Sequence, residues 1–349
     1  MTGLRGTPER LDAFISAMPK VELHLHLEGT LEPEMLLRLA ERNRVEVGFA
    51  DVHALRAAYR FSDLRSFLDL YYRGTEVLVT EQDFFELTLT YLERADAMAI
   101  RHAEVFFDPQ SHTRRGVPFG AVLEGVRAAL DEGERRLGVT SRLIMCFLRD
   151  LGPEAAAATF AEAGPYLDVI DGIGLDSAEV GYPPALFQET FEAARANGLH
   201  AVAHAGEEGP PAYIEQALDL LKVERIDHGV RCLEDPRLVG RLARDRIPLT
   251  VCPLSNVRLG VVPSLEQHAL RRMLAAGLCV TVNSDDPAYF GGYLTENFLA
   301  VRRALDLSFN DIRTLAADSY SAAFIDESRR RRLLAEFDEA ASGYTLDHP

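Results

Sequence analysis

The decapeptide VELHLHLEGT at Val21–Thr30 alternates apolar residues with acidic and imidazole side chains. Alternation of this kind is typical of a β-strand, whose successive side chains point to opposite faces. The leucine face would pack on surrounding helices, and the other face would carry Glu22, His24, His26 and Glu28. A lone His-x-His strand is more often a hydrogen-bonded face than a metal site, although imidazole is the commonest metal ligand. His24 and His26 are therefore candidates that need partners elsewhere.

Three further segments place residues of these types directly after apolar runs. His204 is the last residue but one of LHAVAHA, His228 ends RIDH, and Asp285 with Asp286 follows CVTVNS. Each has an ordinary alternative, because a buried histidine can simply be hydrogen-bonded and Asp before proline is common in turns. Together, three imidazoles and a carboxylate suit a catalytic zinc ion, although iron or manganese would accept the same ligand types. We expect one metal ion with four ligands: His24, His26, His204 and Asp285.

The residues next to these ligands predict the type of reaction. A zinc ion lowers the pKa of bound water to about 7 and so provides hydroxide at neutral pH. In the segment HAGEEG, Glu207 stands three residues beyond His204, where it could transfer protons. His228 is not needed as a ligand and could polarise the attacking hydroxide. The sequence therefore predicts metal-assisted hydrolysis with Glu207 and His228 as catalytic residues.

Residues so far apart in the chain need a fold that brings them together. Eight short apolar segments alternate with amphipathic helical segments, which indicates a parallel α/β sheet. For 349 residues without an internal linker or repeat, a single (β/α)₈ TIM-type barrel domain over 1–349 is the simplest architecture. In such barrels the active site lies at the carboxyl ends of the strands, where all the residues above are predicted to lie.

Two regions extend beyond a minimal barrel. A helical insertion of about 33–99 separates the first strand from the second, and 296–337 predicts extra C-terminal helices. Within the insertion, one stretch presents apolar residues at helical spacing: Phe61, Leu64, Phe67 and Leu68. This stripe could form a lid over the site or could be ordinary helix packing.

Composition and charge limit the classes of partner that this protein is expected to bind. The formal net charge of −17 argues against nucleic acid, whose binding needs a basic surface. The sequence has neither an apolar run long enough to span a membrane nor an N-terminal segment like a signal peptide. Its four cysteines are scattered without close pairing, which suits a reducing compartment. We expect a cytoplasmic protein with a small-molecule substrate; no pattern indicates its oligomeric state.

Five motifs together resemble the adenosine and AMP deaminase family of metal-dependent hydrolases. They are HLHLEG (His24–Gly29), HAGEEG (His204–Gly209), DHGVR (Asp227–Arg231), CPLSN (Cys252–Asn256) and NSDDP (Asn283–Pro287). Their order and spacing match the family from about Met18 to the final helices. The resemblance implies zinc at the four ligands named above, Glu207 as proton donor to purine N1, His228 as the residue that orients hydroxide, and Asp286 as partner of N7.

Within the family, three runs are most similar to the bacterial and fungal adenine deaminases: GLDSAEVGYPP (Gly174–Pro184), EEGPPAYI (Glu207–Ile214) and SDDPAYFGGY (Ser284–Tyr293). This implies hydrolysis of adenine to hypoxanthine and ammonia in purine salvage. Adenosine-type members usually carry Asp, which helps to hold the ribose, where Glu28 stands here. The alternatives are a deaminase of adenosine or of another N6-amino purine such as 6-aminodeoxyfutalosine, and a non-catalytic purine-binding protein, which the presence of Glu207 disfavours.

Overall fold

The computed structural model describes residues 8–346, and these form a barrel of eight parallel strands paired in chain order. The strands are β1 (Lys20–His26), β2 (Ile100–Phe107), β3 (Thr140–Leu148), β4 (Gly172–Asp176), β5 (His200–Ala205), β6 (Arg225–His228), β7 (Pro248–Val251) and β8 (Cys279–Val282). Each strand overlaps one of the eight strand segments predicted from the sequence, and most of its residues are buried. The predicted (β/α)₈ TIM-type barrel is confirmed.

The barrel closes between β8 and β1 through a few bonds just beyond the last residue of β8. The amide of His26 donates to the carbonyl of Asp285 at 3.0 Å, and the amide of Asp285 donates to the carbonyl of His24 at 3.1 Å. One step lower, the side-chain oxygen of Asn283 accepts from the amide of Leu23 at 2.9 Å. This seam fixes the backbones of three predicted metal ligands relative to one another.

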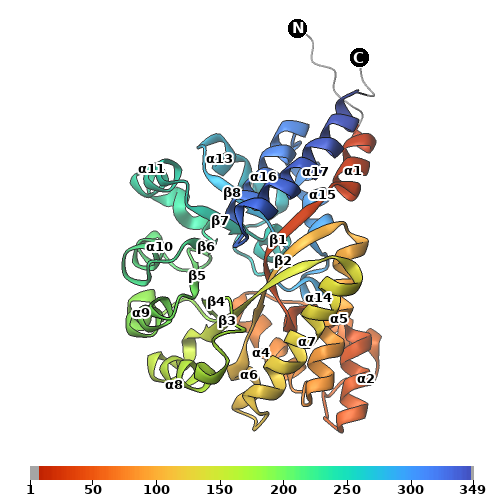
Figure 1. Ribbon diagram of the computed structural model, residues 1–349, viewed down its shortest axis with the longest axis vertical. Helices are drawn as coiled ribbons and strands as arrows, with labels where there is room; N and C mark the ends of the chain where they lie inside the picture. The colour runs from red at the N-terminus through yellow and green to blue at the C-terminus, as the bar shows by residue number, and fades with distance from the viewer. Residues whose placement is uncertain (1–7, 347–349) are drawn as a thin grey trace.

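Helices in the connections cover the outside of the barrel (Figure 1). They are α6 (Pro109–Thr113) and α7 (Phe119–Leu137) after β2, α8 (Pro153–Ala163) after β3, α9 (Gln188–Ala196) after β4, α10 (Pro211–Gln216) after β5, α11 (Pro236–Asp245) after β6, and α12 (Pro253–Arg258) and α13 (Leu270–Ala275) after β7. After β8 come α14 (Pro287–Phe290), α15 (Leu294–Ala304), α16 (Phe309–Ala322) and α17 (Glu327–Leu346).

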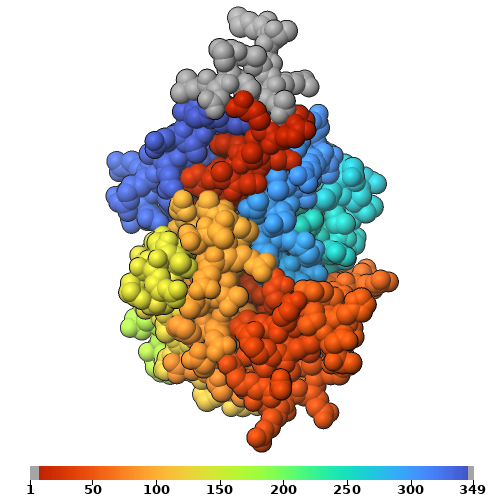
Figure 2. All heavy atoms as spheres, turned by 90° about the vertical axis from the view of Figure 1, so that its right-hand side faces the viewer, coloured from red at the N-terminus to blue at the C-terminus, as the bar shows by residue number. Residues whose placement is uncertain are grey.

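The insertion after β1 lies at one end of the barrel. Its helices are α2 (Pro33–Asn43), α3 (Val52–Ala58), α4 (Leu64–Thr75) and α5 (Glu81–Ala97). In Figure 1 the insertion occupies the lower end, whereas α17 and α1 (Pro8–Ala17) lie at the upper end. Figure 2 shows the insertion as a continuous part of the lower surface. Because α4 lines the cavity at the carboxyl ends of the strands, the insertion covers the end where the predicted site lies.

Local sequence determines where the helix α4 begins and which face it buries. The side chain of Asp63 accepts from the amide of Ser66 at 2.8 Å and forms a capping box, so the helix starts at Leu64. Its residue Phe67 then packs on Phe290 of α14, with ring centroids 4.7 Å apart. This contact anchors α4 beside the segment that follows β8. No helix within residues 8–346 combines the length and apolarity needed to cross a bilayer.

Candidate active site

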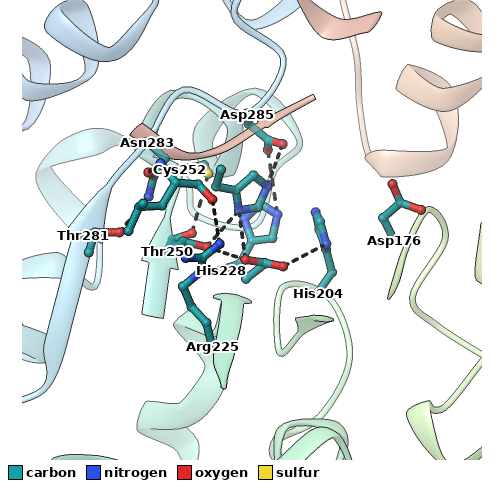
Figure 3. Close-up of polar contacts among 12 residues, drawn as sticks. Asp176, His204, Arg225, His228, Thr250, Cys252, Thr281, Asn283 and Asp285 are labelled. Atoms are coloured by element: carbon teal, nitrogen blue, oxygen red, sulfur yellow. Dashed lines mark hydrogen bonds and ion pairs between the residues drawn. The ribbon is translucent and has the colours of Figure 1, made fainter. Parts of the chain in front are cut away.

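The four predicted metal ligands meet at the carboxyl end of the barrel. His24 and His26 lie at the end of β1, His204 near the end of β5, and Asp285 just after β8. One donor atom of each lies within 4.8 Å of the donor atoms of the other three, and all four side chains are buried. Figure 3 shows His204, His228 and Asp285 around one space, although they come from different strand ends.

The spacing of the donor atoms fits a metal ion. His24 Nε2 lies 3.1 Å and His26 Nε2 lies 3.4 Å from Asp285 Oδ1, and the Nε2 atoms of His26 and His204 are 3.2 Å apart. Ligands of a tetrahedral zinc ion, about 2.0–2.1 Å from the metal, are separated by about 3.3 Å. Two neutral imidazole nitrogens facing each other at this distance can both present lone pairs to one cation.

The outer ring nitrogens of these imidazoles face carboxylates, and that of His24 also makes a hydrogen bond. The Thr250 hydroxyl donates to Asp227 Oδ1 at 2.8 Å, so it accepts from the Nδ1–H of His24 at 2.9 Å. This leaves the Nε2 lone pair of His24 for a cation. Asp227 Oδ2 lies 3.7 Å from His204 Nδ1, and Asp176 Oδ2 lies 3.6 Å from His26 Nδ1. Each of the three histidines therefore has a carboxylate behind it.

Burial keeps most of these imidazoles neutral. It lowers the pKa of His26 to about 4 and that of His228 to about 3, and it holds the pKa of His204 well below its usual value. His24 differs: burial lowers its pKa, but the Asp285 carboxylate outweighs this effect and raises it. Because a metal binds the unprotonated imidazole, the depressed pKa values favour a metal over protons.

The two predicted catalytic residues lie beside the ligands. Glu207 Oε2 is 3.7 Å and Asp285 Oδ2 is 3.8 Å from His228 Nε2, while Glu207 Oε1 is buried without a protein partner. Burial, followed by the charges of Asp285 and Glu179, raises the pKa of Glu207 well above its usual value. A neutral carboxylic acid of this kind can give a proton to a substrate.

His228 and Asp285 share an unusual backbone conformation. Their φ angles are +63° and +65°, in the left-handed region that non-glycine residues rarely adopt, and Ser177 after β4 has φ +68°. Each such residue costs on the order of 1–3 kcal/mol and is typical of functional sites. The turn at each strand end directs these side chains toward the cavity, which all three line.

The cavity beside these residues is narrow, with a free volume of about 30 Å³. One wall comes from α4: Leu64, Phe67, Leu68, Tyr71 and Tyr72. Three of the four residues in the predicted apolar stripe thus line the cavity, whereas Phe61 precedes the helix and packs on Phe67 at 5.3 Å. The Tyr72 and Ser177 hydroxyls are 2.8 Å apart and join α4 to the barrel.

Carboxyl groups form another part of the cavity wall. Asp286 lines the cavity, as do Asp108 and Asp176 at the ends of β2 and β4, and one oxygen of each lacks a protein partner. Burial and the charges of Asp176 and Glu28 raise the pKa of Asp108, and burial raises that of Asp176 to about 7. Asp108 and Asp176 were not among the residues predicted from the sequence, although each comes at the end of an apolar strand segment as the histidines do.

Glu22 and Glu28, which flank the two histidines in the sequence, contact residues outside the predicted metal site. Glu22 accepts from Tyr91 of α5 at 2.8 Å, so it faces a surrounding helix. The β1–β2 register is irregular between Glu22 and Leu25, where the alternation breaks. Glu28 accepts from His112 Nε2 at 2.8 Å and does not line the cavity. Glu22 therefore does not face the barrel mouth, where it was expected to point, whereas Glu28 keeps a buried Oε2 without a protein partner close to the carboxyl groups of the cavity.

Comparisons with known proteins identify the family of this chain. The chain matches the family described as Adenosine deaminase over residues 19–340. A protein of Streptomyces coelicolor named adenine deaminase is 60% identical over 323 residues, which cover 92% of this chain and 95% of the relative.

Solved structures of related enzymes have the same fold as this chain. Adenine deaminase from Arthrobacter aurescens superposes with a TM-score of 0.92 at 51% identity, covering 93% of this chain and 100% of that one. An amidohydrolase from Burkholderia ambifaria with bound zinc has a TM-score of 0.89 at 29% identity, covering 99% and 97% of the two chains. The protein is a hydrolase of carbon–nitrogen bonds, and its chain belongs to the adenosine deaminase family.

Proposed function

We propose that this protein hydrolyses adenine to hypoxanthine and ammonia and thereby serves purine salvage. The oxygen of water forms a bond to C6 while N1 takes a proton, and the bond from C6 to the exocyclic nitrogen then breaks. Ammonia leaves with the protons it needs, and C6 becomes a carbonyl. The observation that carries this proposal is the buried set of four ligand atoms within 4.8 Å, next to a carboxyl group with a free oxygen in the cavity.

The four ligands are His24, His26, His204 and Asp285, and zinc is the proposed metal. Support comes from the tautomer of His24, which presents Nε2 inward, and from the relative whose structure holds zinc. When bound, such an ion lowers the pKa of water to about 7 and so supplies a nucleophile at neutral pH.

Glu207 is the proposed proton donor to N1. Its Oε1 has no protein partner, and burial together with neighbouring carboxylates favours the protonated form. Protonating N1 withdraws electrons from C6 and lowers the barrier to attack on an aromatic ring. A placed general acid of this type contributes about 10²–10⁴-fold to the rate.

His228 and Asp286 hold the reacting partners. His228 Nε2 lies 3.8 Å from Asp285 Oδ2 and 3.7 Å from Glu207 Oε2, a position from which it can hydrogen-bond the attacking oxygen. Asp286 has a buried oxygen without a partner, and burial with the charge of Asp285 raises its pKa well above the usual value. A neutral Asp286 donates a hydrogen bond to N7, which is an acceptor.

Adenine is favoured over adenosine by two observations. Glu28, which stands where adenosine-type relatives usually carry a ribose-binding Asp, does not line the cavity, and its Oε1 accepts from His112. In addition, the Streptomyces coelicolor and Arthrobacter aurescens proteins, 60% and 51% identical, carry the name adenine deaminase.

A substrate panel tests this proposal directly. The zinc-loaded protein is incubated with adenine, adenosine or 6-aminodeoxyfutalosine, and release of ammonia is followed. We expect the highest kcat/KM with adenine. A higher kcat/KM with either nucleoside would contradict the free-base assignment, and no ammonia from any purine would contradict the deaminase reaction.

A further inference from the structure

The loop that carries Glu207 is wrapped around one buried carboxylate. Glu179 Oε1 accepts from the amide of Gly206 at 2.7 Å. Glu179 Oε2 accepts from the next three amides, those of Glu207 at 3.1 Å, Glu208 at 2.8 Å and Gly209 at 2.7 Å. The Glu179 side chain is only 1% exposed, so its charge is balanced by these four N–H groups together with the nearby guanidinium groups of Arg149 and Arg231. We call this arrangement the amide clamp.

The glycines of HAGEEG fit the amide clamp. A Cβ atom at Gly209 would lie 2.4 Å from Glu179 Oε1, which is closer than any side chain tolerates. Gly206 has φ +71°, a conformation that L side chains rarely adopt, and this turns its amide toward the carboxylate. The spacing of two glycines around two glutamates therefore follows from a backbone that closes on Glu179.

Other residues hold the carbonyl groups of the same loop. The amide of Arg231 donates to the carbonyl of Gly206 at 2.9 Å, and its guanidinium donates to the carbonyl of Glu208. The buried Arg149 donates to the carbonyl of His204 at 2.7 Å. The backbone around Glu207 is thus held on both sides, whereas its carboxyl Oε1 has no protein partner.

We propose that Glu179 is a positioning residue, which sets the location of the Glu207 carboxyl relative to the purine without touching it. Glu179 does not line the cavity, so it acts on the purine only through Glu207, by holding the loop and by a charge that helps to raise the pKa of Glu207. The role requires a carboxylate, because its two oxygens offer about four acceptor sites whereas a glutamine amide brings N–H donors against N–H donors. This inference rests on the proposed role of Glu207 as proton donor.

The test compares three variants in zinc-loaded protein. Glu179→Gln removes the acceptor, and Gly209→Ala disturbs the amide clamp from the loop side without changing a charge. Glu224→Gln is the matched control, because that carboxyl pairs with His200 at the amino ends of β5 and β6. A misplacement of about 1 Å costs about 100-fold in rate, so both clamp variants should lose about that much kcat. KM for adenine should change little, and the control should match wild type.

A double variant separates positioning from general destabilisation. If Glu179 acts through Glu207, then combining Glu179→Gln with Glu207→Asp should cost less than the product of the two separate losses. Wild-type kcat in Glu179→Gln, or fully multiplicative losses, would overturn the inference. If Glu179→Gln is insoluble or lacks zinc, Glu179→Asp replaces it, because its shorter side chain cannot reach all four amides; unreduced kcat there would also overturn the proposal. An inactive wild type would instead contradict the proposed function.

Discussion

Burial changes the pKa values of the polar side chains around the cavity more than any single partner does. Burial lowers the pKa of the imidazoles His26 and His228 and raises the pKa of the carboxyls Glu207 and Asp286. Neutral imidazoles bind a metal, and a neutral carboxylic acid donates a proton. The same dry environment thus prepares both parts of the proposed reaction, and individual residues can be tested for each part.

Replacing Glu207 with Gln should separate proton donation from metal binding. The amide keeps the size of the side chain but cannot transfer a carboxyl proton, so kcat should fall by about 10²–10⁴-fold. Zinc content should stay at the wild-type level, because Glu207 is not one of the four ligands. Steady-state kinetics and metal analysis check this. Turnover equal to that of the Glu224→Gln control would refute the assignment.

Replacing a ligand should have the opposite signature. His204→Ala and Asp285→Ala each remove one of the four converging donors, so purified protein should contain much less zinc than wild type. Removing Asp285 also leaves His24 without the carboxylate that raises its pKa. Elemental analysis after dialysis measures the loss. Full zinc occupancy in both variants would contradict the ligand assignment.

Two elements of the fold position the site: the hydrogen-bonded junction between β8 and β1, and the helix α4, which lines the cavity. The β8–β1 seam holds the backbones of His24, His26 and Asp285 in register through two hydrogen bonds of 3.0 and 3.1 Å. The helix α4 forms the wall, packed on α14 through Phe67 and Phe290. It touches the barrel at the hydroxyl pair of Tyr72 and Ser177. The wall is therefore held by aromatic contacts of Phe67 and Tyr71 with α14 and by the hydroxyl pair at Ser177.

Tyr72→Phe should remove the hydroxyl contact with Ser177 while keeping the aromatic ring that lines the cavity. Loss of one hydrogen bond costs about 1 kcal/mol, equivalent to roughly a fivefold change in an equilibrium constant. We expect KM for adenine to rise by a factor of this size, with a smaller change in kcat, because the ring still excludes water from the cavity. Steady-state kinetics measures both constants, and Ser177→Ala should give the same result. Unchanged KM in both variants would mean that this contact does not control substrate binding.

The whole molecule should lose stability in acid through buried groups away from the metal site. Burial lowers the pKa of His268 to about 4, and its Nδ1 accepts from the amide of Leu270 at 3.0 Å, which only a neutral ring can do. Inside the barrel, burial raises the pKa of Glu104, but the Arg225 guanidinium at 2.7 Å outweighs this and lowers it to about 2. In both cases the unfolded chain binds more protons than the native one, so acid favours unfolding.

The pH windows follow from these values. His268 contributes stability that is present above pH 6.5, its unfolded pKa, and is lost as pH falls to about 4, by about 3 kcal/mol. The Glu104 contribution is present above pH 4.5 and is lost as pH falls to about 2. Thermal unfolding between pH 7 and 4 should show His268→Asn losing less stability than wild type. Parallel losses in the two proteins would refute the assignment to His268.

Sequence alone determined the barrel and the residues that converge at its mouth. Strand periodicity is a local property, and parallel barrels gather the carboxyl ends of their strands, so His24, His204 and Asp285 could be brought together without coordinates. The same rule would have found Asp108 and Asp176 if it had been applied to every strand ending in an acid.

Only the tertiary structure decided which way individual side chains turn. Glu22 accepts from Tyr91 next to an irregularity in the strand pairing, and Glu28 accepts from His112 through Oε1. The amide clamp joins Glu179 to a loop 27–30 residues later. Such contacts depend on loop conformations and on the packing of segments distant in sequence, and neither leaves a periodic signal in the chain.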